Sequence, residues 1–175
     1  MLSQTETVAL LQPLLQEKGR TYKKYKRAFV RRAVQDERVR TIVAGKVETE
    51  NVARDGDMVV RADTTFQEEY ILKPDDFERL YDVGSALKIE DHPDAEELMQ
   101  KGFMSYAPTR RAVAIEVDEA IARHFPTGQF LASWGEPMRV EVGDYLASGR
   151  LSADGTVLEI IRIERSAFDQ TYALA

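Results

Sequence analysis

A pattern of residues that occurs twice constrains the fold of this 175-residue chain more than any other feature. In each copy a Gly-Asp pair precedes a short apolar run, a Glu-bearing β-prone run, and then Phe, an acid, two residues and Tyr. The first copy runs from Gly56-Asp57 to Tyr81 and the second from Gly143-Asp144 to Tyr172. The Gly-to-Phe interval is 21 residues in the first copy (56 to 77) and 25 in the second (143 to 168), a difference that a longer hairpin turn at 151–156 can absorb. The repetition predicts an internal duplication.

Each copy is predicted to form a strand, a turn, a strand, a turn and a short helix. Glycine tolerates a positive φ and the following Asp can accept bonds from nearby backbone amides, so the Gly-Asp pair suits a tight turn. Pro74 can take a first helical position, and the run from Ser166 to Asp169 resembles a capping box. The predicted strands are 58–61, 70–72, 145–147 and 157–163, with further strands upstream at 28–35, 39–47, 112–117 and 130–140.

Two helices are expected outside the copies. Residues 5–16 carry a wide apolar stripe, which Pro13 should kink or interrupt, and residues 93–102 form a second helix that ends at Gly102. The stripe needs a cover, either the sheet or a second subunit in a homodimer. The predicted fold class is therefore α+β, with two similar β-rich halves that each end in a short helix, an N-terminal helix and a linker helix. The predicted divisions are an N-terminal helical segment 1–20, a first repeat 21–83, a helical linker 84–108 and a second repeat 109–175.

The repeated motif resembles the small PGDYG-motif domains of bacterial and phage proteins. Asp55 and Val142 stand where that family has proline, and Val59 and Leu146 stand where it has its second glycine. The resemblance covers roughly two-thirds of the chain when the upstream strands are included. It implies a compact domain and no established reaction, so it supplies no catalytic residues.

Composition narrows the classes of function. Lys and Arg number 24 against 30 Asp and Glu, and the net charge of −6 argues against general binding to phosphate backbones. The absence of cysteine excludes disulfides, thiolate nucleophiles and zinc sites of the Cys type. The first residues do not resemble a signal peptide and no apolar run approaches the length of a membrane span, so we expect no membrane partner and a cytoplasmic location.

Residues 18–40 form a basic segment, although the net charge of the chain is negative. Aromatic residues are interleaved with its cations, a combination that can bind nucleic acid through phosphate contacts and stacking. The preferred interpretation is a solvated charged face neutralised by acids of the second copy. The segment comprises Lys18, Arg20, Lys23, Lys24, Lys26, Arg27, Arg31, Arg32, Arg38 and Arg40, with Tyr22, Tyr25 and Phe29 among them.

The repeated acids and the two histidines are the candidates for chemistry. Asp57 and Asp144 could bind a metal or serve as acid and base, but capping of their turns is the favoured interpretation. His92 and His124 have no metal-ligand or triad spacing and are interpreted as surface or capping residues. No Walker loop, dinucleotide fingerprint or nucleophile elbow occurs, so the sequence predicts no cofactor and no metal.

The sequence therefore favours a non-enzymatic binding or accessory module with a ligand or partner surface between its repeats. The ligand would be a small phosphorylated molecule or a protein partner. Two alternatives stay open: a small enzyme acting on a nucleotide or phosphorylated substrate, and a nucleic-acid-associated protein that uses residues 18–40. Trp134 can anchor a partner or fill the core, and filling the core is the favoured interpretation. The candidate binding residues are Trp134, Arg110, Arg111, Tyr70, Tyr145, Asp57 and Asp144.

Overall fold

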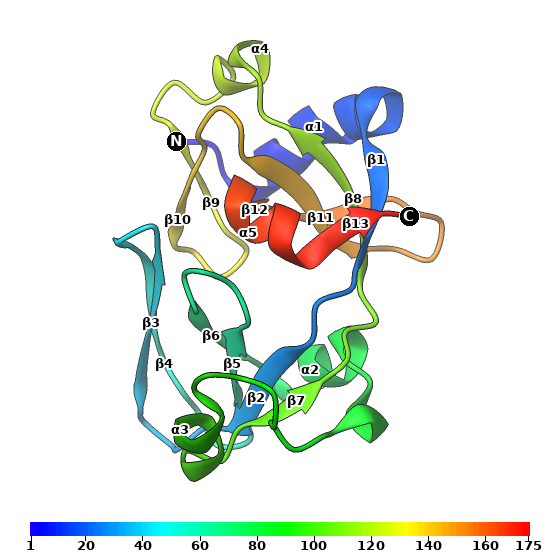
Figure 1. The fold of residues 1–175 in the computed structure, drawn as a ribbon. Coiled ribbons are helices and arrows are strands. Elements are labelled where there is room, and N and C mark those ends of the chain that lie inside the picture. Colours follow the sequence, from blue (N-terminus) through cyan, green and yellow to red (C-terminus); the bar gives the residue numbers. More distant parts are fainter. The chain divides into compact units, whose positions relative to one another are not determined.

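The computed structural model describes residues 1–175 and divides into two compact units. Unit 1 consists of residues 1–23 and 111–175, and unit 2 consists of residues 24–110 (Figure 1). Both units combine helices with antiparallel sheets, so the predicted α+β class is confirmed. None of the helices is long and apolar enough to cross a bilayer.

Unit 1 is built around a five-stranded sheet with the strand order β12-β11-β8-β1-β13. Its strands are β1 (Arg20–Lys24), β8 (Arg111–Glu116), β11 (Tyr145–Leu151), β12 (Val157–Ile163) and β13 (Tyr172–Leu174). A separate hairpin joins β9 (Gln129–Leu131) to β10 (Pro137–Arg139). The helices are α1 (Gln4–Lys18), α4 (Glu119–Ala122) and α5 (Arg165–Thr171).

Helices α1 and α5 cover opposite faces of this sheet. Leu11 and Leu15 of α1 pack in a cluster with Ile115 of β8, whereas Phe168 of α5 packs with Ala114. Because neighbouring residues of a strand point to opposite faces, the two helices lie on different sides. The apolar stripe of α1 thus packs on its own sheet, the first of the two predicted alternatives.

Helix α1 is continuous from Gln4 to Lys18, so an interruption at Pro13, one of the two predicted effects, does not occur. Ser3 and Glu6 form a reciprocal capping box that satisfies two amides of the first turn. Pro13 is exposed, while Leu11 and Leu15 are buried on the opposite side of the helix. Burial of these leucines stabilises the helix and offsets the hydrogen bond that Pro13 cannot donate.

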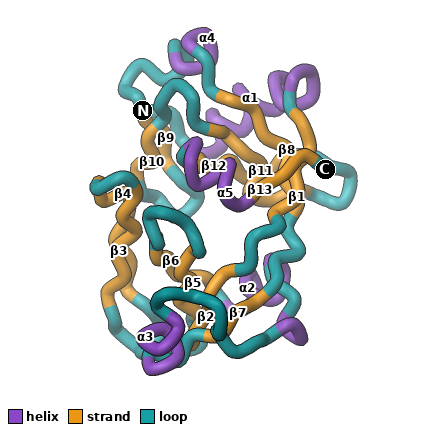
Figure 2. Tube along the Cα trace, viewed as in Figure 1, coloured by secondary structure: helices purple, strands orange, loops and turns teal.

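Unit 2 contains a four-stranded sheet with the order β6-β5-β2-β7 and a separate β3-β4 hairpin. Strands make up much of the trace in Figure 2. The strands are β2 (Ala28–Arg32), β3 (Arg38–Val43), β4 (Lys46–Val52), β5 (Met58–Ala62), β6 (Glu69–Leu72) and β7 (Met104–Tyr106). The helices are α2 (Pro74–Leu80), the short 3-10 helix η1 (Val83–Ser85) and α3 (Ala95–Gln100).

Two predicted strands are hairpins instead. The predicted strand 39–47 contains a turn at Ala44-Gly45, where both residues have a positive φ (51° and 74°), and a two-residue turn of this kind joins antiparallel strands. The predicted strand 130–140 is likewise interrupted, by a turn between β9 and β10. At the helix starts, Pro74 takes the predicted first position, but the predicted Ser166 cap is wrong because the Glu164 side chain accepts from the Ala167 amide.

The sheets of the two units have matching registers and matching cores. Val30 of β2 lies opposite Val60 of β5, as Ala114 of β8 lies opposite Ala147 of β11. The Phe of the helix that follows and the Tyr directly after that helix pack on the same sheet face in each unit. The matching residues are Ala28, Val30, Val60, Phe77 and Tyr81 in unit 2 and Ala112, Ala114, Ala147, Phe168 and Tyr172 in unit 1.

Candidate functional site

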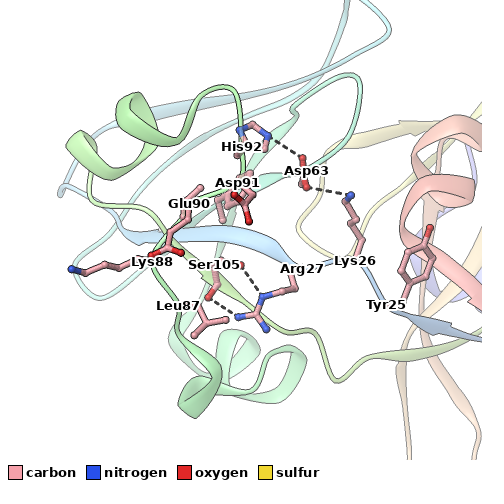
Figure 3. Close-up of a pocket in the computed structure, with 12 residues that line it drawn as sticks. Tyr25, Lys26, Arg27, Asp63, Leu87, Lys88, Glu90, Asp91, His92 and Ser105 are labelled. Carbon is pink, nitrogen blue, oxygen red and sulfur yellow. Dashed lines mark hydrogen bonds and ion pairs between the residues drawn. The ribbon is translucent and has the colours of Figure 1, made fainter.

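A pocket of about 550 Å³ opens on unit 2. Its walls come from four segments that are distant in the sequence (Figure 3). They are residues 25–27 and Phe29 around the start of β2, Asp63 after β5, the loop 87–92 before α3, and Ser105 of β7. Unit 2 alone supplies these residues.

Asp63 is the centre of a charged cluster in this pocket. Lys26 Nζ lies 3.3 Å from Asp63 Oδ2, and His92 Nε2 lies 3.2 Å from Asp63 Oδ1. Figure 3 shows the Lys26 and His92 side chains directed at Asp63 from different sides. The Asp94 amide donates to His92 Nδ1 at 3.0 Å, so Nδ1 is the acceptor and Nε2 carries the proton donated to Asp63. Both ring nitrogens are therefore engaged.

The ring of His92 is also fixed by packing. It meets Phe29 edge to face, with 5.0 Å between the ring centroids and 75° between the planes. The His92 side chain is 17% exposed, against 40% for Lys26. The pocket therefore combines a rigid wall, made by His92 and Asp63, with a more accessible ammonium group.

Arg27 braces the opposite wall. Its Nε donates to Ser105 Oγ at 2.8 Å, and its Nη2 donates to the carbonyls of Ser85 and Ser105 at 2.6 and 3.0 Å. These bonds tie the start of β2 to β7 and to the end of η1. A planar guanidinium suits such multiple contacts, so Arg27 acts chiefly as a brace.

The rest of the lining supplies apolar surface and balanced charge. Leu87 and Tyr25 are 57% and 52% exposed, whereas Ile89 behind them is buried. Three cations and three acids line the pocket. Because these charges balance, the pocket does not favour a ligand with several charges of one sign. The cations are Lys26, Arg27 and Lys88, and the acids are Asp63, Glu90 and Asp91. The geometry suits a small ligand that has an acceptor for Lys26 and an apolar portion.

The two repeated aspartates lie in turns. Asp57 is buried and its Oδ2 accepts from the Arg54 amide at 2.8 Å. Asp144 is also buried, its Oδ1 accepts from the Arg165 amide at 3.1 Å, and its Oδ2 lies 2.6 Å from Arg162 Nη2. Both aspartates satisfy backbone amides, as the favoured capping interpretation predicts.

The other predicted site residues are dispersed. The Tyr70 hydroxyl lies 3.3 Å from the Tyr81 hydroxyl, and the Tyr145 ring stacks on Phe168 at 3.8 Å between centroids. Trp134 is 47% exposed in the β9-β10 turn, so the favoured interpretation of Trp134 as a core residue is wrong. Arg110 ends unit 2 with its Nε buried and without a hydrogen-bond partner, and Arg111 is exposed at the start of β8. None of the seven predicted residues lines the pocket.

Little in the sequence points to the pocket. Lys26 is only one of many cations in its segment, and Asp63 lies in a polar turn like many others. His92 carries a weak signal, since it precedes Pro93-Asp94 at a helix start, where a capping role is expected. Its bond from the Asp94 amide fits that expectation, but its pairing with a carboxylate 29 residues away follows only from the fold.

Four of the ten cations of the basic segment, Lys26, Arg31, Arg38 and Arg40, pair with acids of unit 2 and not, as expected, with acids of the second copy. Arg31 makes a two-pronged contact with Glu37, at 2.8 and 2.9 Å. The hydrogen bonds from Arg31 lower the pKa of Glu37 below its usual value. Arg38 and Arg40 both contact Glu50 across the β3-β4 hairpin.

Comparisons with protein-family models, with curated proteins and with solved structures found no match to this chain.

Proposed function

We propose that this chain is a non-enzymatic binding module made of two copies of one β-rich repeat, and that the pocket in unit 2 is its ligand site. The resemblance to PGDYG-motif domains is part of this proposal. The observation that carries it is the cluster of Lys26, Asp63 and His92, held rigidly beside exposed apolar surface.

The duplication is supported by backbone and core geometry that the two copies share and that amino-acid composition alone would not produce. Gly56 and Gly143 have φ values of 87° and 93°, and the aspartate after each has its carbonyl bonded to an amide of the neighbouring strand's end (Ala33 and Val117). Each copy then places Phe and Tyr four residues apart with their rings stacked. A random resemblance of two short motifs would not preserve turn, register and core together.

The pocket arises where the two units differ. In unit 1, α1 begins at Gln4 and runs for 15 residues before β1. In unit 2, the helix before β7 is only 6 residues long, and the preceding residues 87–92 form the pocket wall. One scaffold with a changed loop is a common way to add a binding site, because loops can vary without loss of the core.

The same contacts favour binding over catalysis. A general base needs a free lone pair within reach of a substrate, and both nitrogens of His92 are occupied by Asp63 and by the Asp94 amide. Arg31, Arg38 and Arg40 are paired with carboxylates. This pairing makes a nucleic-acid surface less favoured, since phosphate contacts require cations that are available for binding.

Thermal unfolding with a panel of probes tests the proposal. The panel is acetate, inorganic phosphate, nucleoside monophosphates, N-acetylated amino acids with apolar side chains, and a short oligonucleotide. A ligand at 100 times its Kd stabilises a protein by about 2.7 kcal/mol, which raises the Tm of a chain of this size by roughly 5 to 10 °C. We expect the N-acetylated amino acids, which join a carboxylate to an apolar group, to give the largest shift.

The variant Lys26→Met should abolish that shift. Lys101→Met is the matched control, because Lys101 has similar exposure (51% against 40%) and also pairs with one acid, Glu97, but does not line the pocket. Retention of the shift in both variants would place binding outside the pocket. A panel that moves the Tm nowhere would contradict the proposed function.

A further inference from the structure

The correspondence between the repeats extends upstream of the Gly-Asp turns. Residues 20–33 align with residues 104–117 at a constant offset of 84 positions, without a gap. Tyr22 and Tyr106, Arg27 and Arg111, and Ala28 and Ala112 are identical across this alignment. In the first repeat the aligned stretch is β1 followed by β2, and in the second it is β7 followed by β8.

The pairing of these four strands crosses between the repeats. β1 pairs with β8, with Thr21 opposite Val113, and β7 pairs with β2, with Ser105 opposite Phe29. Under the offset of 84 these are the same pair of positions, so the two ladders have one register. The unit boundaries agree, because β1 and β8 belong to unit 1 while β2 and β7 belong to unit 2.

We propose that the two repeats are reciprocally exchanged: each gives its leading helix and strand to the sheet of the other, so that each half of the chain is a binding partner for the other half. The exchanged segments, which we call arms, are α1 with β1 and α3 with β7. This inference rests on the proposed duplication and is independent of the pocket.

Aromatic packing at the two arm sites is the same. Tyr22 of the first arm meets Phe168 edge to face, at 4.9 Å between centroids and 79° between planes. Tyr106 of the second arm meets Phe77 at 5.1 Å and 85°. Each arm thus presents a tyrosine to the phenylalanine of the other repeat's closing helix. This contact and the strand edge beside it form the recognition surface.

Each arm also contributes core residues to its host unit. Leu11 and Leu15 of the first arm pack with Leu146 and Ile160 of the second repeat. Leu98 of the second arm packs with Phe29 and Val59 of the first repeat. All seven side chains are buried in the structure, with 6% exposure or less. Removing an arm would therefore open a core as well as a sheet edge.

Disulfide trapping in the full-length chain tests the exchange, and the absence of native cysteine leaves no background. The Val113 amide donates to Ser148 Oγ on the β11 side, so Thr21 and Val113 form a non-hydrogen-bonded pair with the close Cα spacing that a disulfide accepts. The variant pair is Thr21→Cys with Val113→Cys. The matched control is Ser105→Cys with Val113→Cys, which would be neighbours only if β7 stayed with its own repeat.

A protease recognition sequence inserted between Glu90 and Asp91, both exposed, separates the repeats after the disulfide has formed. We expect oxidised Thr21→Cys/Val113→Cys protein to keep its two fragments covalently joined in denaturant until a reductant is added. Both control cysteines lie in the second fragment, so the control falls into two fragments in either case, and titration of its free thiols before reduction shows whether its disulfide has formed. We expect both thiols of the control to be free. Without any cysteine, the cut protein should still elute as one species in native buffer.

Two results would overturn the exchange. One is a disulfide that forms in the Ser105→Cys/Val113→Cys control and not in the test variant, a result that would leave the duplication and the pocket standing. The other is separation of the cut, cysteine-free protein into two folded fragments in native buffer.

Discussion

Replacement of Asp144 by Asn should destabilise unit 1 far more than the equivalent change at Asp57 destabilises unit 2. Both aspartates are buried and both accept a backbone amide in their turns. Only Asp144 also pairs with a buried cation: Arg162 Nη2 and Nε lie 2.6 and 2.8 Å from its Oδ2, and the Arg162 and Asp144 side chains are 2% and 7% exposed.

The difference in cost follows from what each variant leaves behind. The Asp144→Asn variant would leave the Arg162 guanidinium buried after the loss of the carboxylate 2.6 Å away, while Glu141 lies 3.9 Å from Arg162 Nη2. Removing one partner of a buried ion pair costs about 3 to 5 kcal/mol, a large share of the roughly 5 to 15 kcal/mol that stabilises a typical domain. Asp57→Asn weakens one hydrogen bond, for about 1 kcal/mol.

Urea denaturation at about pH 7.5 measures both costs. Burial raises the pKa of Asp144 to about 6, so its carboxylate is ionised under these conditions. Far-UV circular dichroism follows the whole chain, and fluorescence of Trp134, the sole tryptophan, reports on unit 1. The double variant Asp144→Asn with Arg162→Met removes both charges, and it should recover most of the lost stability because the buried cation that had lost Asp144 is gone. Equal costs for Asp57→Asn and Asp144→Asn, or a cost below about 1 kcal/mol for Asp144→Asn, would exclude the buried cation as the source of the difference.

Two further predictions concern unit 2 and the first arm. Arg31 lowers the pKa of Glu37 in the folded state, so this pair stabilises the protein above the unfolded-state pKa of about 4.3 and the contribution is lost as the pH falls through the lower folded value. Glu37→Gln should cost about 1 to 2 kcal/mol near pH 7 and nothing in strong acid, with a smaller effect for Glu50→Gln; an undiminished cost in acid would exclude the ion pair as its cause. Gly19→Ala places a Cβ 2.4 Å from the Leu15 carbonyl oxygen, so thermal unfolding should show a loss of about 1 to 3 kcal/mol, and an unchanged Tm would show that the junction can relax.

Prediction of local structure from the sequence succeeded best at residue types with one strong conformational preference, such as glycine in a turn and proline at a helix start. Gly56 and Gly143 both have a positive φ, which the tight turn before each strand requires. Pro74 begins its helix, as predicted. The helix is not interrupted at Pro13, because burial of Leu11 and Leu15 outweighs one missing hydrogen bond. Propensity is a weak guide wherever tertiary packing decides.

Long-range arrangement could not be predicted in the same way. The similarity between the runs 26–28 and 110–112 is visible in the sequence, but so short a match does not fix an alignment by itself. The equivalence of the two runs becomes plain only when the ladders of β1 and β7 are found to share one register. The pocket could not be predicted for the same reason, because Asp63 and His92 meet only through the fold.

The repeated, exchanged architecture can be tested in the full-length protein by the pattern of nuclear Overhauser effects among four aromatic rings. We expect effects between Tyr22 and Phe168, whose ring centroids are 4.9 Å apart, and between Tyr106 and Phe77, at 5.1 Å. Effects between Tyr22 and Phe77 and between Tyr106 and Phe168 would contradict the exchange, because they would show each repeat folded upon its own arm.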